Sequence, residues 1–294
     1  MNILVSGASG LIGSEVSRLL TAQGHRVLPL RRNSDSMPCW DIERKIVQLD
    51  PAQQIDVVIH LAGENVAQGR WTAAKKERIL RSRVEGTRLL AEFFAAAPTK
   101  PRLMISASAI GFYGDRGDEE LDETSTKGTG FLSDVSQAWE AATRPAAEAG
   151  IRVVNTRFGM VLSADGGALT KVLPPFRMGL GGPVGNGSQY MSWVSIHDVA
   201  LAIRHIMVQE ELHGPVNIVA PHPVTNRQFT RVLSKVLRRP AFFPVPRFIL
   251  SFFLGEMARE LLFASAQVYP RKLQASGYVF ATPDIDSALQ RLLR

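Results

Sequence analysis

The sequence predicts an α/β protein with a doubly wound parallel sheet and a smaller C-terminal lobe. A short apolar strand, Ile3 to Ser6, runs directly into a glycine-rich turn that opens an amphipathic helix. Strand and helix patterns then alternate through the first half of the chain, which is typical of parallel βαβ units. From about Gly166 the chain is rich in turns, and its elements become short. These observations favour a Rossmann-type domain over residues 1–165, with its sheet completed by later strands, and a smaller lobe over residues 166–294.

The glycine-rich turn carries the strongest functional signal. Gly7, Gly10 and Gly13 form a GxxGxxG pattern between the first strand and the first helix. Glycine permits the tight turn and lets a pyrophosphate approach the backbone, and the helix directs its N–H groups and positive dipole end at that anion. We therefore expect a dinucleotide site, with a plain surface turn as the alternative. The expected contacts are Gly7, Ser9, Gly10, Leu11, Ile12 and Gly13.

Two arginines at the end of the second strand favour NADP over NAD. The strand pattern runs from Arg26 to Leu30 and is followed by Arg31 and Arg32. An acidic residue near this place binds the ribose 2′-hydroxyl of NAD, whereas a basic residue suits the 2′-phosphate of NADP. The alternative is a solvated strand end, with Asp35 as an acidic partner.

The following elements continue the alternation. Asp56 to Leu61 is a nearly continuous apolar run, as expected of a strand buried on both faces. We expect further strands over residues 102–107 and 151–162, and helices over residues 74–97, ended by Pro98, and 132–149. In such open sheets ligands bind at the carboxyl ends of the strands, so the C-terminal lobe should wall a cleft there.

The C-terminal lobe has fewer clear signals. Thr225 and Gln228 predict a capping box for a helix that ends at about Leu237. Prolines then mark a linker into a terminal segment, residues 240–294. Within it, Phe248 to Leu254 is strongly apolar but far too short to span a bilayer. We expect it to pack within the lobe, the alternatives being contact with a membrane surface or a partner.

Composition narrows the class of protein. Of the 294 residues 45% are apolar and 21% are charged, as in an ordinary soluble globular protein. The net charge of +7 is spread over 34 basic and 27 acidic side chains, and the densest basic run, residues 75–83, is interrupted by acids, so nucleic acid is not an expected partner. The single cysteine, Cys39, excludes an internal disulfide and fits a buried thiol in the cytoplasm. Six scattered histidines give no metal signal, and the first strand begins at the N-terminus, so we expect no signal peptide.

Several blocks of sequence resemble the short-chain dehydrogenase/reductase superfamily, in its extended, epimerase/dehydratase-like branch. The matching blocks are Ser6 to Gly13, His60-Leu61-Ala62-Gly63, and Ser106-Ala107-Ser108 with Tyr113-Gly114. Others are similar to a little-characterised subfamily of NADP-binding "epimerase family" proteins, some of which carry the label of cell-division inhibitor. They are Leu61 to Asn65, Arg70-Trp71, Trp139-Glu140, and Leu173 to Arg177 with Gly179 to Pro183. The resemblance covers essentially the whole chain.

The resemblance implies NADP(H) as the cofactor, with Leu61, Ala62, Gly63 and Ser106 beside it, but it does not supply the catalytic pair. Enzymes of this superfamily use a tyrosine as acid and base, and a lysine four residues later lowers the pKa of that tyrosine. Counted back from Trp139-Glu140, the two positions hold Leu132 and Ser136. None of the four tyrosines is followed by a lysine at that spacing.

Other residues are candidates for the missing roles. Ser108 fits the hydroxyl that hydrogen-bonds the substrate oxygen in the superfamily, and Tyr113 is the best substitute proton donor, or else an aromatic side chain that packs. Tyr113 would need a cation nearby, for which Arg83 and Arg157 are the candidates. We place both arginines among the cofactor contacts. Arg83 replaces the usual helix asparagine, and its alternative role is a surface charge.

Two further residues are candidates for substrate contact on the cleft wall, Arg177 and Trp193. Arg177 would clamp an anionic group, with a structural ion pair as the alternative. His197 and Asp198 predict the start of a helix capped near Ser195 rather than a catalytic pair. His60, at the end of a buried strand, is expected to be a histidine with satisfied hydrogen bonds beside the cofactor.

The leading hypothesis is an atypical NADP(H)-dependent oxidoreductase or epimerase-like enzyme without the Tyr–Lys pair. Its substrate would be a small molecule, anionic or nucleotide-linked. The alternative is a catalytically inactive NADPH sensor that acts through a protein partner in cell division. No membrane association is expected, and by analogy with extended relatives a homodimer would form through the helices at 74–97 and 132–149.

Overall fold

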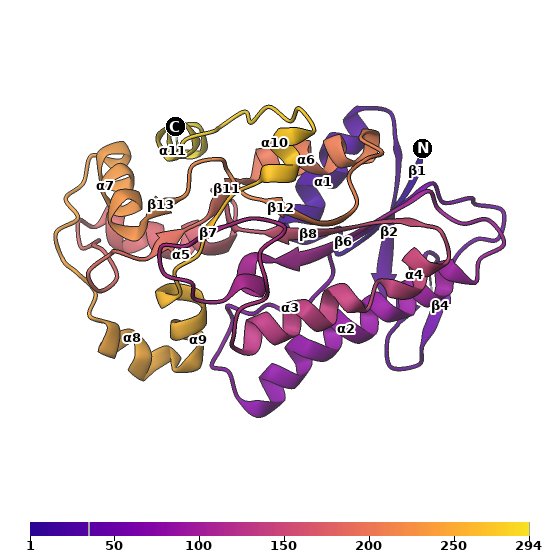
Figure 1. Cartoon of the computed structure of the whole chain (residues 1–294), viewed down its shortest axis with the longest axis horizontal. Helices are drawn as coiled ribbons and strands as arrows, with labels where there is room; N and C mark the ends of the chain where they lie inside the picture. Colours follow the sequence, from indigo (N-terminus) through magenta and orange to yellow (C-terminus); the bar gives the residue numbers. More distant parts are fainter. Residues whose placement is uncertain (35, 294) are drawn as a thin grey trace.

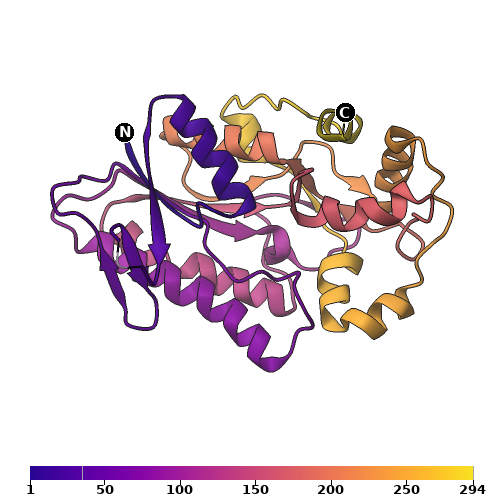
Figure 2. The ribbon, with the colours of Figure 1, turned by 180° about the vertical axis from the view of Figure 1, so that it is seen from behind.

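The computed structural model describes residues 1–34 and 36–293. Asp35, the acidic partner weighed for the arginines before it, lies outside the described residues. The described chain forms a central sheet covered by helices on both faces, with a smaller lobe at one end of it (Figures 1 and 2).

Eight strands form the central sheet. Their spatial order is β12 (Gly214–Ile218), β8 (Arg152–Phe158), β6 (Leu103–Ala109), β5 (Val57–His60), β1 (Asn2–Ser6), β2 (Arg26–Arg32), β3 (Cys39–Asp41) and β4 (Ile46–Gln48). All neighbours are parallel except β3 and β4, which form an antiparallel pair. The order reverses at β1, as in a doubly wound sheet. The predicted fold class is confirmed.

Helices cover the two faces of the sheet. One face carries α1 (Leu11–Ala22) and α6 (Ile196–Val208), and the other carries α2 (Ala73–Ala95), α3 (Phe131–Ala141) and α4 (Arg144–Glu148) (Figure 1). Side chains alternate along each strand, so one strand supplies both cores. Ile3 and Val5 of β1 join the core beneath α1 and α6, and Leu4 joins the core beneath α2.

Two expected elements are divided in the structure. The helix expected over residues 132–149 is two helices, because Pro145 has no N–H for a helical hydrogen bond and lies in the first turn of α4 instead. The strand expected over 151–162 ends at Phe158. After Gly159, β9 (Met160–Leu162) leaves the main sheet and pairs with β11 (Trp193–Ser195).

The smaller lobe has its own apolar core. It is built from α5 (Gly167–Arg177), α7 (Asn226–Leu237) and α11 (Ile285–Leu293), with the strand pair β10 (Tyr190–Met191) and β13 (Val224–Thr225). The predicted capping box of Thr225 and Gln228 is confirmed at the start of α7. Between sheet and lobe lie the 3₁₀ helix η1 (Ile110–Tyr113) and the strand pair β7 (Glu120–Leu121) and β14 (Gln267–Val268), whereas α10 (Arg271–Ala275) packs against β12 of the main sheet. Because β12 returns to the main sheet, the chain passes between the sheet and the lobe more than once.

The apolar segment after the linker does not pack within the lobe. It forms α8 (Arg247–Leu254), none of whose residues is buried, and Phe248, Phe252 and Phe253 are 72%, 75% and 63% exposed. The prediction of internal packing is therefore wrong. The chain turns at Gly255 directly after α8, and the next helix, α9 (Glu256–Ala258), contacts α2 and η2 (Arg259–Phe263). Within the described residues, no helix is both long and apolar enough to cross a membrane.

Candidate functional site

The glycine turn forms a cradle without side chains at the carboxyl end of β1. Gly7 has φ +70°, and its carbonyl accepts a hydrogen bond from Gly10 N at 2.9 Å. A Cβ on Gly13 would lie 2.1 Å from Gly7 O, and one on Gly7 would lie 2.9 Å from Ala62 N. Gly10 is the N-cap of α1 and no side chain caps it, so the first amides of the helix remain available to an anion. This geometry fits a pyrophosphate, with Ser9 exposed in the turn and Leu11 and Ile12 in the first turn of the helix.

The two arginines stand at the end of the neighbouring strand. Ser6 of β1 is paired with Leu30 of β2, which places Arg31 and Arg32 just beyond the glycine turn. Both are exposed. By the alternation of the strand, Arg32 projects to the α2 side, as Leu28 and Leu30 do.

Ser6 links β1 to the segment after β5. Its Oγ lies 2.6 Å from His60 Nδ1 and accepts hydrogen bonds from Leu61 N at 3.2 Å and Ala62 N at 3.4 Å. Among the described residues, His60 Nε2 has no hydrogen-bond partner, so the expectation of a fully satisfied histidine is correct only for Nδ1. Complete burial lowers the pKa of His60 to about 4, and the ring is therefore neutral at pH 7.

The buried histidine predicts a specific loss of stability in acid. The unfolded chain takes up this proton below about pH 6.5, whereas the folded protein takes it up only below about pH 4. The free energy of unfolding should therefore fall by about 3 kcal/mol between these pH values. Urea unfolding at several pH values measures it. His60→Asn should remove this part of the pH dependence of the free energy of unfolding, whereas a His222→Asn control at an exposed site should keep it. An equal pH dependence in the wild-type protein and both variants would contradict the assignment to His60.

Arg83 lies between the segment after β5 and Trp139 of α3. A Cβ on Gly63 would lie 3.4 Å from its guanidinium. Arg83 Nη1 donates to Glu64 O at 2.9 Å and to Ile79 O at 3.3 Å, and the guanidinium stacks on Trp139 with 4.9 Å to the ring centre. Burial lowers its pKa to about 10, so it stays cationic at neutral pH.

Glu64 is held by neighbouring cations. Lys75 Nζ donates to its carboxylate at 2.6 Å, and this hydrogen bond lowers the pKa of Glu64 from its ordinary value, with a smaller contribution from the charge of Arg32. The residues after β5 are thereby tied to α2 and lie near the end of β2.

Ser108 and Tyr113 belong to a buried network around Glu140 and Arg157. Ser108 Oγ donates to Glu140 Oε1 at 2.7 Å. Arg157 binds both oxygens of that carboxylate at 2.7 and 2.8 Å, donates to Tyr113 Oη at 2.9 Å, and stacks on Phe112 with 3.5 Å to the ring centre. The network joins β6, η1, α3 and β8.

Tyr113 is a poor proton donor in this environment. Its hydroxyl donates to Asn217 Oδ1 at 2.8 Å, and the side chain has no exposed surface. Burial raises the pKa of Tyr113 to about 12, which outweighs the opposite effect of the Arg157 charge. The predicted cation does approach the tyrosine, but it does not make the phenol more acidic than usual. The geometry therefore argues against the acid role expected of Tyr113.

A cavity of about 910 Å³ opens at the carboxyl ends of β6 and β8. Ala109 and Phe158, the last residues of the two strands, line it, together with Arg83, Trp139 and Ser136. Its outer wall comes from the lobe and from η2. Ser136, at the position where the superfamily carries its lysine, presents a neutral hydroxyl instead.

Several predicted contacts lie outside this cavity. Ser108 and Arg157 are buried in the network, and Ser106 is buried within β6, so none of them lines it. Trp193 has no exposed surface, and its Nε1 donates to His222 O at 3.1 Å, because β11 passes through the core of the lobe. Arg177 ends α5 on the exposed side, while Phe176 before it faces the cavity. The structure thus places Trp193 and Arg177 away from the expected cleft wall.

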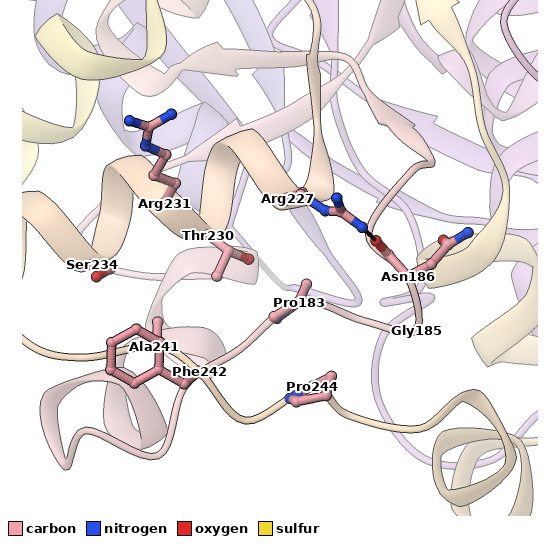
Figure 3. A pocket seen from close by; sticks show the side chains of 10 residues that line it. All are labelled: Pro183, Gly185, Asn186, Arg227, Thr230, Arg231, Ser234, Ala241, Phe242 and Pro244. Carbon is pink, nitrogen blue, oxygen red and sulfur yellow. Dashed lines mark hydrogen bonds between the residues drawn. The ribbon is translucent and has the colours of Figure 1, made fainter.

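A second, shallower pocket of about 510 Å³ lies between α7 and the segment around Phe242 (Figure 3). Its two arginines are on α7. Arg227 donates to Asn186 O at 2.6 Å, and Arg231 points away from that contact (Figure 3). The larger cavity is the better candidate, because it opens at the strand ends where a doubly wound sheet binds its ligands.

Sequence reasoning missed two acids that organise the site. In the sequence Glu140 stands out only as part of the Trp139-Glu140 block, and its pairing with Arg157 spans 17 residues. Glu260 of η2 accepts hydrogen bonds from Phe131 N and Leu132 N at 3.0 Å and so caps α3 from a segment more than 120 residues away. No local pattern marks either contact. Among the described residues there is no cluster of side chains suited to a metal ion.

His197 and Asp198 lie in the first turn of α6, which confirms the predicted helix start. Ser195 is the N-cap of α6 and accepts a hydrogen bond from Asp198 N at 3.0 Å. The buried Asp198 carboxylate also accepts hydrogen bonds from Ala281 N and Thr282 N, which ties the C-terminal segment to α6.

Family models and similar sequences both relate the chain to epimerase family proteins. Residues 3–220 match the NAD dependent epimerase/dehydratase family, and residues 245–292 match a domain of unknown function (DUF1731). The chain is 38% identical over 291 residues to epimerase family protein Mb2239 of Mycobacterium bovis, covering 98% of this chain and 96% of that protein. It is 34% identical over 297 residues to human epimerase family protein SDR39U1, covering all of both chains.

Solved structures agree with these matches. The crystal structure of human SDR39U1 with NADPH superposes with a TM-score of 0.92 at 33% identity over 99% of each chain. A nucleoside-diphosphate sugar epimerase from Corynebacterium glutamicum gives a TM-score of 0.80 at 34% identity, over all of this chain and 58% of the other.

Proposed function

Because the chain belongs to the NAD dependent epimerase/dehydratase family, we propose that it is an NADP(H)-dependent oxidoreductase that works without a Tyr–Lys pair. The glycine cradle carries this proposal. It stands beside two exposed arginines, and through Gly63 and Arg83 it adjoins a cavity at the strand ends. The NADPH in the human relative supports the choice of coenzyme.

The proposed coenzyme contacts follow from the geometry. Backbone amides from Leu11 to Gly13 would bind the pyrophosphate, and Arg31 and Arg32 would bind the 2′-phosphate. Leu61 to Gly63 would line the path to the cavity, and Arg83 would present the edge of its guanidinium that is not committed to Glu64 O.

The side chains of this protein would contribute mainly by positioning the coenzyme and the substrate, and less by transferring protons. When bound, NADPH would provide a hydride. In the cavity, Ser136 would donate a hydrogen bond to a substrate oxygen, and the apolar wall would exclude water. The Glu140–Arg157 network would hold β6, η1 and α3 in place. A positioned acid usually contributes about 10²–10⁴-fold, so we expect slow turnover.

Charge reversal at the end of β2 tests the coenzyme. In Arg32→Glu and in Arg31→Glu we expect NADPH affinity to fall about 10- to 100-fold, since a charge-assisted hydrogen bond contributes about 1.5–3 kcal/mol. NADH affinity should change little. Fluorescence titration at fixed ionic strength measures both. Arg26→Glu, at the opposite end of the same strand, is the control. Parallel losses for NADPH and NADH would argue against a 2′-phosphate site.

Transfer of deuteride from 4-deuterated NADPH to carbonyl compounds tests the oxidoreductase activity. Label in the product, reduced in Ser136→Ala, is the expected result. Tight NADPH binding without transfer to any compound of the panel would contradict catalysis.

A second candidate is an NADPH sensor that acts through a protein partner. The exposed phenylalanines of α8 favour it, because such a cluster is typical of an interaction surface. Here we expect a defined partner protein whose affinity for this chain changes when NADPH is added. The variant Phe252→Ser should no longer bind that partner. A partner that binds equally well with and without NADPH would contradict the sensor hypothesis.

A further inference from the structure

The chemistry of the cavity wall indicates what kind of substrate it takes. Most of the wall is hydrocarbon, from α3 and β8 on one side and from α5, α7 and η2 on the other. Leu132, Val135 and Phe158 lie on the sheet side, and Val172, Phe229 and Leu262 face them from the lobe and η2. A volume of about 910 Å³ is at the upper end of the range for small-molecule sites.

The charged groups on the wall do not form an anion site. Three are basic and three are acidic, so their charges cancel: Arg83, Lys171, Arg259, Asp115, Glu256 and Glu260. Most are already bound within the protein. Lys171 Nζ donates to Ala67 O at 2.7 Å, and Glu256 is paired with Lys76 at 2.9 Å. Arg259 is exposed at the rim.

The N-terminus of α3, which faces the cavity, is also occupied. Gly130, Phe131 and Leu132 at the start of α3 line the wall, but the carboxylate of Glu260 accepts the hydrogen bonds of the last two amides. A Cβ on Gly130 would come within 2.5 Å of that carboxylate, which shows how closely it is seated. A substrate diphosphate would therefore meet a negative charge where it would otherwise find a positive dipole end.

We propose that the cavity takes an uncharged, largely hydrocarbon carbonyl compound rather than a nucleotide-diphosphate sugar. This proposal rests on the proposed oxidoreductase function. The carbonyl carbon accepts a hydride from NADPH, which becomes NADP⁺. The carbonyl oxygen takes a proton from solvent through the Ser136 hydroxyl, and the product is an alcohol. This proposal differs from the prediction of an anionic or nucleotide-linked substrate.

A chain-length series tests the substrate class by binding alone. Unbranched methyl ketones from butanone to 2-dodecanone are titrated into the full chain, with and without saturating NADPH, alongside UDP and UDP-glucose. We expect affinity to rise about three- to fourfold per methylene until the cavity is filled, because each buried methylene contributes about the same transfer free energy. The two uridine compounds should not bind in the cavity.

Two variants locate the binding. Val172→Asp places a carboxylate on the apolar wall, and Ala264→Phe fills part of the space; both should abolish the dependence on chain length. Val279→Asp, at an exposed valine outside the wall, should leave it unchanged. NADPH affinity of each variant reports whether it is folded.

The outcomes separate the two proposals. UDP-glucose binding that competes with the ketones, or ketone affinity that does not change with chain length, would overturn the apolar-substrate inference while the coenzyme assignment stands. Absence of NADPH binding would overturn the proposed function, and the titration without coenzyme would still decide whether the cavity prefers hydrocarbon.

Discussion

Replacement of Arg157 by leucine is expected to lower the free energy of unfolding by about 3–5 kcal/mol. Arg157 is 3% exposed and makes two short hydrogen bonds to Glu140, one to Tyr113 and a stacked contact with Phe112. Its removal leaves a carboxylate with little access to water and without its counter-charge. Burying an uncompensated charge is among the largest costs that one substitution can impose.

Urea unfolding monitored by circular dichroism measures this effect, with Arg88→Leu on the exposed surface of α2 as the control. The double variant Glu140→Gln/Arg157→Leu should be more stable than the sum of the single losses predicts, because the stranded charge is gone. Additive losses would show that the two side chains do not act as a pair.

Substitution of Gly13 by alanine is expected to weaken NADPH binding at least about 100-fold, equivalent to about 2.7 kcal/mol. The added methyl group would stand 2.1 Å from Gly7 O and 2.8 Å from Gly7 C. Both neighbours are backbone atoms, so the turn itself must move, and with it the amides proposed to bind the pyrophosphate.

Titration with NADPH tests this, and thermal unfolding checks that the variant is folded. Ser14→Ala, at the next and exposed position of α1, is the matched control and should bind normally. A folded Gly13→Ala protein with unchanged NADPH affinity would mean that the coenzyme is not bound at this turn.

Elements governed by neighbouring residues could be predicted from the sequence. The strand, glycine turn and helix at residues 2–22 depend on local hydrophobic spacing and on glycine geometry, and they form as expected. The capping box at Thr225 is likewise a contact over three residues. The predicted bounds of helices and strands were wrong where one residue interrupts a longer pattern, as at Pro145 and Gly159.

The environment of individual side chains could not be predicted in this way. Tyr113 meets Arg157 and Asn217, which lie 44 and 104 residues further along the chain. The sequence showed that a cation was needed, but not that burial would dominate the pKa. Trp193 and the phenylalanines of α8 are all large aromatic residues, yet the first is fully buried and the others are exposed.

The sequence by itself determined the doubly wound sheet and the glycine cradle, because both arise from periodicity and backbone geometry within short stretches of chain. Only the tertiary structure decided which polar groups face the cavity and which are neutralised by partners, as Glu260 shows at the start of α3. Solvation and pairing depend on residues distant in the chain, and these set the charge that a substrate would meet.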